Sequence, residues 1–589
     1  MPPFPKILVA NRGEIAIRVF RTLRELGIGT VGVYSEADRG SLHVGYADEA
    51  YLIGPPPAAQ SYLNVERIIE TARRADAAAV HPGYGFLAEN AGFARACADA
   101  GLAWIGPPPE AIEAMGSKVE ARERMKAAGV PIIPGTTEPV ETAEEALALG
   151  EEIGYPLAIK AASGGGGKGL KVARSPDEVE RSYTSARREG EAYFGDSTVY
   201  VERFLEDPRH VEVQVLADAH GKVVHLGERD CTIQRRHQKL VEETPSPAVS
   251  VELRERIGGI AIDAARAVGY RSAGTIEGLL SREGEYFFLE MNTRIQVEHP
   301  VTELVTGFDL VREQVLIAAG EPLSFRQEDV RFSGHAIECR INAEDVAAGF
   351  LPSPGLITAY REPAGPGVRV DSGVADGSEV SGTYDPLIAK VIVHGLDREH
   401  ARRRMLRALE EYVIEGPKTL IGFHRALLSH QCFVEGETCF GLVDSELLAR
   451  QAEELEPAGA TAGANGRAMD TRTSLVELDG RRYEVRVLVP EPQFKELARR
   501  RHDRRQDAHG GHARDAVTSP MQGTVLAVDV ADGDEVSSGQ VLCVVEAMKM
   551  ENEITAHRDG VVSELSVAAG QAVNAGQVIC VITQDGDEP

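Results

Sequence analysis

The chain contains an internal repeat near its C-terminus, in which residues 531–546 match residues 568–583. The identical pairs are Ala531/Ala568, Gly533/Gly570, Val536/Val573, Gly539/Gly576, Gln540/Gln577, Val541/Val578, Cys543/Cys580 and Val544/Val581, followed by Gly523/Gly560 and Val525/Val562. Each half alternates short β-favouring runs with turns centred on glycine, so the repeat predicts a small two-fold barrel of paired hairpins. Lys549, between two methionines, then lies in the tight turn that joins the halves. Most lysines are solvated surface charges, but one at a symmetric tip suits a protein that attaches a group there and moves it.

Size and composition limit the class of protein. At 589 residues the chain is too long for one core, and we expect roughly three to five domains. The net charge of −28 argues against broad nucleic-acid binding. The seven cysteines show no CxxC or metal-type spacing, so we expect free thiols in a reducing cytosol. No signal segment and no apolar run of ~18 residues is present, so we expect a cytoplasmic protein without a membrane partner.

Residues 1–114 show the alternation of strands and helices that is typical of an open parallel sheet. The expected elements are a strand at Lys6–Ala10, a helix at Glu14–Leu26 that Gly27 ends, and strands at Thr30–Tyr34, Ala77–His81 and Trp104–Gly106. The region lacks a GxGxxG pattern, so a dinucleotide site is not predicted.

Changes in sequence composition and motif content divide the chain after residue 114 into further regions. Residues 115–330 carry dense polar motifs, with a mobile lid expected at about 131–204, and residues 331–447 form a further α+β region. Residues 448–514 are predicted to be a linker with a short hairpin at Ser474–Val489, whose turn is Asp479-Gly480. The hairpin with its flanks could be a reduced docking module, and a stray hairpin in a tether is the plainer interpretation. Residues 515–589 form the repeat domain.

A glycine-rich loop, Ser163–Gly169, follows a strand that ends in Lys160. Glycines leave backbone N–H groups free to surround phosphate oxygens, and Lys168 adds positive charge. No Ser or Thr follows Lys168, so the loop is not the GxxxxGK[ST] type. A glycine-rich hairpin tip without a ligand is equally consistent with the loop alone. The order of motifs favours a phosphate flap, because Lys118 and Lys160 precede the loop and a hinge strand, Glu202–Leu205, follows it.

Alternating polar residues run from Glu290 to Glu298 directly after the apolar run Tyr286–Leu289. In an extended strand Glu290, Asn292, Arg294, Gln296 and Glu298 share one face. A solvated face is the ordinary explanation. However, polar groups that leave a buried strand need partners, and a metal–nucleotide site supplies them. Glu277, on the expected neighbouring strand, can join Glu290 and Asn292 in a Mg²⁺ site built from oxygen ligands.

The chain resembles two known families. Over about residues 1–447 it is similar to the ATP-grasp enzymes of the biotin carboxylase family, through motifs that occur in the family's order: His81–Leu87, Ser163–Gly169, Glu228–Cys231, Gln234–Lys239, Glu290–His299 and Glu338–Asn342. Lys168 and Arg203 stand where relatives often exchange lysine and arginine. The Ala-Met-Lys-Met stretch around Lys549 resembles the biotinyl carrier domain over about residues 515–585, whereas lipoyl domains usually lack Met-Lys-Met. The resemblance implies a multidomain fold: an α/β N-terminal domain with an open sheet, an ATP-grasp domain, an α+β C-terminal biotin carboxylase domain and a small all-β flattened barrel.

The resemblance also implies roles for single residues. ATP would be held by Lys118, Lys160, Glu202, Leu205, His210, Gln234, His237 and the loop residues Gly165, Gly166, Gly167 and Lys168, and Tyr84 belongs to the same cofactor-binding set. Mg²⁺ or Mn²⁺ would be held by Glu277, Glu290 and Asn292, and bicarbonate by Lys239, Arg294, Gln296, the Val297 backbone and Glu298. His237 has no second His or Cys at ligand spacing, so a metal role for it is rejected.

In the implied reaction, Glu298 deprotonates bicarbonate for attack on the γ-phosphate of ATP. A carboxylate beside Arg294 and Lys239 stays ionised, and the cations stabilise the charge on carboxyphosphate. Carboxyphosphate gives CO₂ and phosphate, the phosphate takes the N1 proton of biotin, and Arg340 stabilises the biotin enolate. A structural ion pair of Arg340 with Glu338 or Glu344 is the alternative. Biotin itself would be carried covalently on Lys549.

Of the 142 residues after residue 447, the carrier takes about 75, which leaves no room for a carboxyltransferase in this sequence. The second half-reaction is therefore expected on another chain. The layout resembles the α subunits of acetyl-/propionyl-CoA carboxylases of the actinobacterial kind. The expected partners are a biotin protein ligase, further copies of the chain within a hetero-oligomer, and a carboxyltransferase β subunit. Alternatives are a methylcrotonyl- or geranyl-CoA carboxylase subunit, and a non-catalytic biotin or lipoyl carrier.

Overall fold

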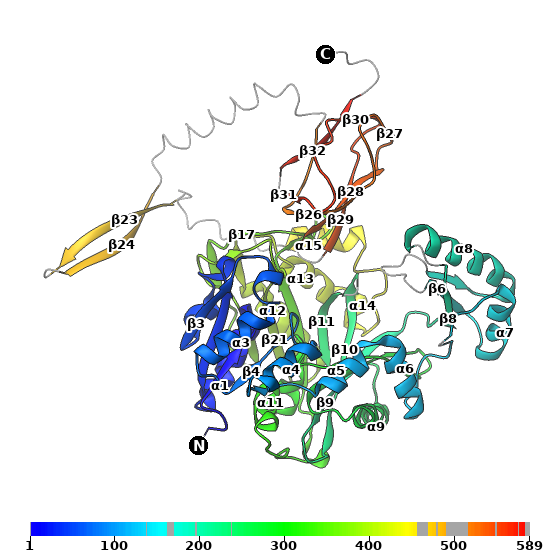
Figure 1. Ribbon diagram of the computed structural model, residues 1–589, viewed down its shortest axis with the longest axis horizontal. Helices are drawn as coiled ribbons and strands as arrows, with labels where there is room; N and C mark the ends of the chain where they lie inside the picture. Colours follow the sequence, from blue (N-terminus) through cyan, green and yellow to red (C-terminus); the bar gives the residue numbers. More distant parts are fainter. Residues whose placement is uncertain are drawn as a thin grey trace.

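The structure is a computed structural model that describes residues 2–136, 138–161, 170–194, 197–236, 238–455, 469–478, 481–490, 516–547, 550–574 and 576–583. Lys549, His237, the glycine loop Ser163–Gly169 and the turn Asp479-Gly480 lie outside the described residues, as does the side chain of Lys118. The chain is multidomain, as expected (Figure 1).

The N-terminal part is a five-stranded parallel sheet in the order β3-β2-β1-β4-β5. Its elements are β1 (Lys6–Val9), α1 (Gly13–Glu25), β2 (Gly29–Ser35), α2 (Leu42–Tyr46), β3 (Glu49–Gly54), α3 (Val65–Arg74), β4 (Ala79–His81), α4 (Ala91–Asp99), β5 (Ala103–Trp104) and α5 (Pro109–Gly116). Ile15, Val19 and Leu23 of α1 are buried against the sheet, and Gly27 follows the helix with φ +70°, a conformation that favours glycine. The predicted open sheet is confirmed.

A single eight-stranded sheet, in the order β13-β12-β9-β10-β11-β14-β21-β19, runs through residues 209–395. Its strands are β9 (Arg209–Ala217), β10 (Val223–Arg235), β11 (Gln238–Thr244), β12 (Ser272–Leu280), β13 (Tyr286–Asn292), β14 (His335–Asn342), β19 (Val368–Ser372) and β21 (Leu387–Gly395). Because β11 pairs with β14, the sheet continues across the boundary expected at residue 330.

Helices and short strands cover this sheet. They are α6 (Lys118–Ala127), α9 (Val251–Ala267), α10 (His299–Thr306), α11 (Leu310–Ala318), α12 (Arg398–Glu411), α13 (Ile421–Ser429), α14 (Gln431–Val434), α15 (Glu446–Leu455), β15 (Glu344–Asp345), β16 (Leu351–Pro352), β17 (Gly355–Leu356), β18 (Ala359–Arg361), β20 (Glu379–Val380) and β22 (Val413–Glu415). Leu448 and Ala452 of α15 are buried in the main core, so ordered helix extends past residue 447, where the linker was expected to begin.

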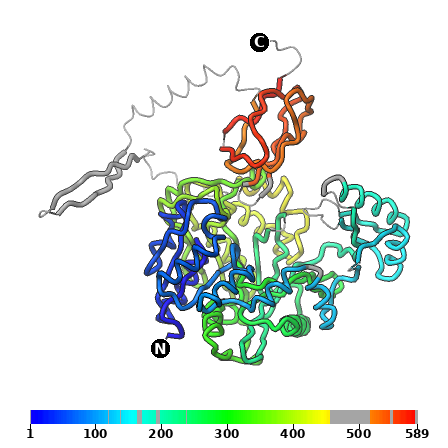
Figure 2. Tube along the Cα trace, in the orientation of Figure 1, coloured from blue at the N-terminus to red at the C-terminus, as the bar shows by residue number. Residues whose placement is uncertain are grey.

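A lid projects from the side of the molecule (Figures 1 and 2). It consists of the sheet β7-β6-β8, formed by β6 (Leu157–Ala161), β7 (Leu170–Ala173) and β8 (Val199–Arg203), with α7 (Ala143–Ile153) and α8 (Pro176–Phe194) packed on it. The antiparallel pairing of β6 with β7 confirms the hairpin that was expected on either side of the glycine loop.

The C-terminal repeat folds into two four-stranded sheets, β25-β32-β30-β27 and β29-β28-β26-β31. The strands are β25 (Ala516–Thr518), β26 (Gly523–Val528), β27 (Glu535–Val536), β28 (Val541–Ala547), β29 (Met550–Thr555), β30 (Gly560–Ser563), β31 (Ala572–Val573) and β32 (Val578–Thr583). Ala547 pairs with Met550, so β28 and β29 are neighbouring strands on either side of Lys549. In the preceding segment β23 (Met469–Leu478) pairs with β24 (Arg481–Pro490), which confirms a hairpin longer than expected.

Two expectations from composition can be compared with the structure. All seven cysteines are free thiols. Among the described residues, no helix is both long and apolar enough to cross a membrane.

The N-terminal domain contains a pH-sensitive contact at His43. Burial lowers the pKa of His43 to about 4, whereas the unfolded value is near 6.5. Between these values the unfolded chain binds the extra proton, so stability falls as the pH is lowered, by about 3 kcal/mol over the window. We expect His43→Gln to remove this component from denaturant unfolding followed by Trp104, the only tryptophan, which lies in the same domain. Parallel pH dependences in the two proteins would contradict the assignment.

Candidate active site

One large cavity of about 1930 Å³ collects nearly all of the described candidate residues. Those that line it are Tyr84, Lys160, Glu202, His210, Gln234, Lys239, Glu277, Glu290, Asn292, Arg294, Gln296, Val297, Glu298 and Arg340. Leu205 does not line the cavity, and it packs against Ile133 and Phe287. A cavity of this size has room for a nucleotide and a second substrate.

The sheet brings the acidic residues together by strand register. Glu277 on β12 lies opposite Glu212 on β9 and opposite Glu290 on β13. The neighbouring-strand prediction for Glu277 and Glu290 is therefore confirmed. Glu212 was missed, although it stands in the alternating run His210-Val-Glu212-Val-Gln214 that marks one polar face of a buried strand.

The expectation of one extended strand through Glu298 is wrong. Strand β13 ends at Asn292, residues 293–298 form a loop and turn, and α10 begins at His299. A register shift after Glu277 leaves Leu289 exposed on the cavity wall, although the run Tyr286–Leu289 was expected to be wholly buried. Such a bulge bends a strand and redirects its side chains, so the polar run reaches the cavity by bending away from the sheet.

Lys239 and Glu298 lie at the centre of the charged cluster. The Lys239 ammonium is 2.8 Å from Glu298 Oε1, 2.9 Å from Glu277 Oε1 and 2.5 Å from Glu212 Oε2. Burial alone raises the pKa of Glu298, but the cations of Lys239 and Arg340 outweigh burial and hold this pKa well below its usual range. Glu298 directly precedes α10, but its side chain makes no capping hydrogen bond to the helix, and its carboxylate binds Lys239 and Arg340. The base candidate is thus ionised.

Arg340 does not form the structural pair that was considered for it. Its Nη2 donates to Glu298 Oε2 at 2.8 Å and its Nε to Glu242 Oε1 at 2.6 Å, rather than to Glu338 or Glu344. Arg340 and Lys239 therefore bind different oxygens of the Glu298 carboxylate. Burial raises the pKa of Glu242 to about 7, with the Arg340 cation opposing the shift.

Arg294 lies at the N-terminal side of the same cavity. Its Nε donates to Glu89 Oε2 at 2.9 Å and its Nη2 to Asn292 Oδ1 at 2.8 Å. Glu89 also accepts from the backbone N–H of Thr293 at 2.9 Å. The N-terminal domain thus anchors the polar loop through Glu89, a contact that sequence patterns did not reveal because the two residues are far apart in the chain.

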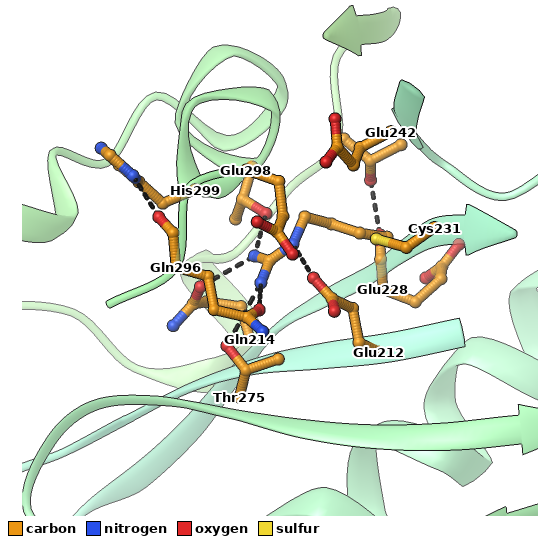
Figure 3. A network of polar contacts seen from close by, with 12 residues as sticks. Glu212, Gln214, Glu228, Cys231, Glu242, Thr275, Gln296, Glu298 and His299 are labelled. Carbon is orange, nitrogen blue, oxygen red and sulfur yellow. Dashed lines mark hydrogen bonds and ion pairs between the residues drawn. The ribbon is translucent and has the colours of Figure 1, made fainter. Parts of the chain in front are cut away.

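A fully buried guanidinium, that of Arg229 on β10, binds several side chains of one polar network. Figure 3 labels four of these partners, Glu212, Gln214, Thr275 and Gln296. All donor nitrogens of Arg229 bind oxygen acceptors within 3.2 Å: Glu212, Gln214, Thr275, Gln296 and Thr302. Gln296 in turn donates to Glu277 Oε1 at 2.6 Å. Arg229 therefore fixes the orientation of Gln296, which lines the cavity, and of Glu212, which binds the cavity residue Lys239.

Arg229→Met should be strongly destabilising. Removing the guanidinium leaves the Glu212 carboxylate and two amide oxygens without this partner, and breaking a buried pair costs about 3–5 kcal/mol. Calorimetric unfolding measures the loss. The control Arg67→Met removes an exposed pair with Glu70 and should cost less than about 1 kcal/mol. A loss of unfolding free energy below about 1 kcal/mol for Arg229→Met would contradict the assigned role.

The acidic residues have the donor chemistry for a divalent cation. Glu277 and Glu290 present carboxylates from opposite positions of adjacent strands, and both line the cavity with Asn292. Oxygen donors of this kind suit Mg²⁺. His210 Nε2 lies 2.7 Å from Glu277 Oε2, and His210, Glu212 and Glu277 have ligand atoms within 4.8 Å of one another. Burial raises the pKa of Glu277, but His210 and Lys239 lower it below its usual range, so the carboxylate is available as a ligand.

The remaining candidates that line the cavity come from the lid and from β10 of the main sheet. Lys160 on β6 forms an ion pair with Glu202 on β8, and β6 pairs directly with β8. Gln234 Nε2 donates to the Cys231 carbonyl at 2.8 Å. Phe440, which was not anticipated, lines this cavity with 84% of its surface exposed. An exposed ring on a polar cavity suits the face of a planar ligand.

Four family descriptions match the chain in sequence order. Residues 3–112 match the biotin carboxylase N-terminal domain, and residues 117–326 match the ATP-binding domain of the carbamoyl-phosphate synthase L chain. Residues 338–445 match the biotin carboxylase C-terminal domain, and residues 515–582 match the family described as biotin-requiring enzyme.

Some similar proteins match about three quarters of this chain, and one matches nearly all of it. A pyruvate carboxylase subunit of Methanothermobacter thermautotrophicus is 55% identical over 75% of this chain and 90% of its own length. Biotin carboxylase 1 of Bacillus subtilis is 56% identical over 73% of this chain and 96% of its own. The biotin-dependent acyl-coenzyme A carboxylase alpha3 subunit of Mycobacterium leprae is 47% identical over 94% of both chains.

Solved structures agree with these sequence matches. The biotin carboxylase domain of Hydrogenobacter thermophilus 2-oxoglutarate carboxylase, in complex with MgADP, ADP and bicarbonate, has a TM-score of 0.67 at 49% identity over 75% of this chain and 99% of its own. The biotin carboxylase subunit of pyruvate carboxylase has a TM-score of 0.70 at 50% identity over the same shares. The chain therefore belongs to the biotin carboxylase family and is an ATP-dependent ligase. Its biotin carboxylase domains are followed, in the same chain, by a biotinyl carrier domain.

Proposed function

We propose that this chain is the α subunit of an acyl-CoA carboxylase, which carboxylates biotin on Lys549 for transfer to acetyl-CoA or propionyl-CoA by a separate β subunit. The similarity to the M. leprae acyl-CoA carboxylase subunit carries this proposal, because it spans 94% of both chains and includes the carrier. The M. thermautotrophicus pyruvate carboxylase subunit is more identical, but matches only 75% of this chain. Methylcrotonyl- and geranyl-CoA remain the alternative substrates.

In the proposed reaction different cavity residues bind ATP, Mg²⁺ and bicarbonate. ATP phosphates would lie near Lys160 and His210, and Glu277, Glu290 and Asn292 would hold Mg²⁺, which would neutralise phosphate charge. Lys239, Arg294 and Glu298 would hold bicarbonate, and Glu298 would take its proton as the bicarbonate oxygen attacks the γ-phosphate and ADP leaves. Lys239 and Arg340 then stabilise the negative charge that gathers on carboxyphosphate and on the acceptor.

The contacts of Glu298 explain how an ionised, weakly basic carboxylate becomes a base. Lys239 and Arg340 both bind Glu298 at 2.8 Å. An entering anion shares these two cations, so the carboxylate loses part of their stabilisation and its pKa rises. The proton acceptor is thus strengthened at the moment when bicarbonate is in place.

The carrier lies beside the biotin carboxylase part of the chain (Figure 1). Gln522, Gly523, Thr524, Glu546 and Ala572 of the carrier line the same cavity as Glu298 and Arg340. Glu546 belongs to β28, the strand that leads into the Met548-Lys549 segment. This placement supports delivery of biotin to the carboxylase site of the same chain, whereas transfer to the acyl-CoA requires the carrier to reach another polypeptide.

Co-purification with the natural partner, followed by a carboxylation assay, tests the proposal. The biotinylated chain is purified from its native lysate with its bound partner, and carboxylation of acetyl-, propionyl-, methylcrotonyl- and geranyl-CoA and of pyruvate is measured with MgATP and bicarbonate. We expect acetyl-CoA or propionyl-CoA to be carboxylated. Carboxylation of pyruvate alone would reject the acyl-CoA assignment while leaving the biotin carboxylase intact.

A further inference from the structure

A lysine beneath the candidate site has no role in the reaction as described. Lys390 on β21 is completely buried and does not line the cavity. Across the sheet its neighbours are Arg340 on β14 and Asp371 on β19. Helix α10 packs on β14 and β21, so Lys390 lies between the sheet and the helix that begins directly after Glu298. A buried ammonium is unfavourable unless specific partners bind it.

Three parts of the chain meet at this ammonium. Lys390 Nζ donates to the Val297 carbonyl at 2.8 Å. It lies 3.4 Å from Glu14 Oε2 and 4.0 Å from Asp371 Oδ2. The Tyr84 hydroxyl donates to Glu14 Oε1, so the N-terminal domain is joined to the same contact.

The hydrogen bond to Val297 fixes one peptide unit. The Val297 carbonyl belongs to the peptide whose nitrogen is that of Glu298, so its orientation sets the direction in which the Glu298 side chain leaves the backbone. We propose that Lys390 is a positioning residue, which holds this peptide so that the Glu298 carboxylate stays between Lys239 and Arg340. The proposal rests on the proposed function, in which Glu298 is the base.

Charge neutralisation alone does not explain Lys390. Burial raises the pKa of Glu14 to about 7 and that of Glu338 well above its usual value, although the Lys390 cation opposes both shifts, so neither residue requires a full counter-charge. Asp371 already binds Arg369 at 2.7 Å. The close, directional contact that remains is the one to Val297, the residue before Glu298.

The test compares the fully buried cation of Lys390 with the partly buried cation of Arg398. Lys390→Met removes the donor at nearly constant shape, and the matched control is Arg398→Met. Arg398 also binds a carboxylate, Glu243, and a backbone carbonyl, that of Val434, but it does not line the cavity. We expect Lys390→Met to lower kcat/KM for bicarbonate by about 10²-fold, because small misplacements of a reacting group have effects of this size. MgADP affinity should change less than about twofold, and Lys390→Arg, which keeps a cationic donor, should recover about tenfold of the loss.

Each outcome decides the proposal. Equal effects of Lys390→Met and Arg398→Met on kcat/KM for bicarbonate, or a loss of MgADP affinity that parallels the loss of turnover, would show a structural role only. If Lys390→Met does not fold, the comparison of Lys390→Arg with Lys390→Gln decides, since positioning requires the longer donor to be the more active. A wild-type chain without bicarbonate-dependent ATP cleavage would instead refute the proposed function itself.

Discussion

Lys549→Arg is expected to abolish biotin labelling of the chain and all carboxylation that depends on the carrier. Arginine keeps the positive charge, but its guanidinium does not deprotonate near neutral pH and offers no amine for acylation. Lys549 is the only lysine in residues 515–589, so no neighbouring lysine of the carrier replaces it. Carboxylation of free biotin should persist, because the cavity residues are unchanged. Intact mass after treatment with a biotin ligase, together with a free-biotin assay, measures both effects.

The control for this prediction is Lys495→Arg, the same chemical change in the segment before the repeat. It should leave labelling and turnover unchanged. Biotin on the Lys549→Arg chain would overturn the carrier assignment, and a lipoyl mass on the wild-type chain would replace it with a lipoyl carrier.

Glu298→Gln is expected to lower bicarbonate-dependent ATP cleavage by about 10²-fold or more. Glutamine keeps the shape of the side chain but accepts no proton at neutral pH. MgATP affinity should stay near normal, since Glu298 contacts Lys239 and Arg340 rather than the lid residues. Phosphate release with and without bicarbonate, alongside equilibrium nucleotide binding, measures the two effects.

Glu243→Gln is the matched control, because Glu243 is also buried and also binds two basic side chains, those of His335 and Arg398, but does not line the cavity. It should affect stability more than turnover. Retained turnover in Glu298→Gln would remove Glu298 as the base.

Short-range sequence patterns correctly predicted the secondary-structure elements that neighbouring residues determine. The repeat of residues 531–546 at 568–583 predicted paired hairpins, because β-favouring runs and glycine turns are short-range signals. The same reasoning failed at residues 290–298. Polar alternation persisted there after the strand had ended at Asn292, and Pro300, in the first turn of α10, was the local signal for the helix start.

The residues that were missed depend on contacts between distant segments. Glu242 meets Arg340 only because β11 lies beside β14, and Lys390 meets Val297 only because α10 packs on β21. No spacing within one segment encodes these pairs. The family motifs indicated which residues to bring together, whereas the sheet order determines which buried charges support them.

Transfer of radiolabelled bicarbonate to the chain's own carrier tests the central claim most directly. The biotinylated wild-type chain is incubated with MgATP and labelled bicarbonate, without acyl-CoA, and the acid-labile label bound to protein is measured. We predict ATP-dependent label on the wild-type chain, none on Lys549→Arg, and an initial labelling rate lowered by about 10²-fold or more on Glu298→Gln. Label that is independent of ATP, label on Lys549→Arg, or a wild-type labelling rate in Glu298→Gln would contradict carboxylation at this cavity of biotin carried on Lys549.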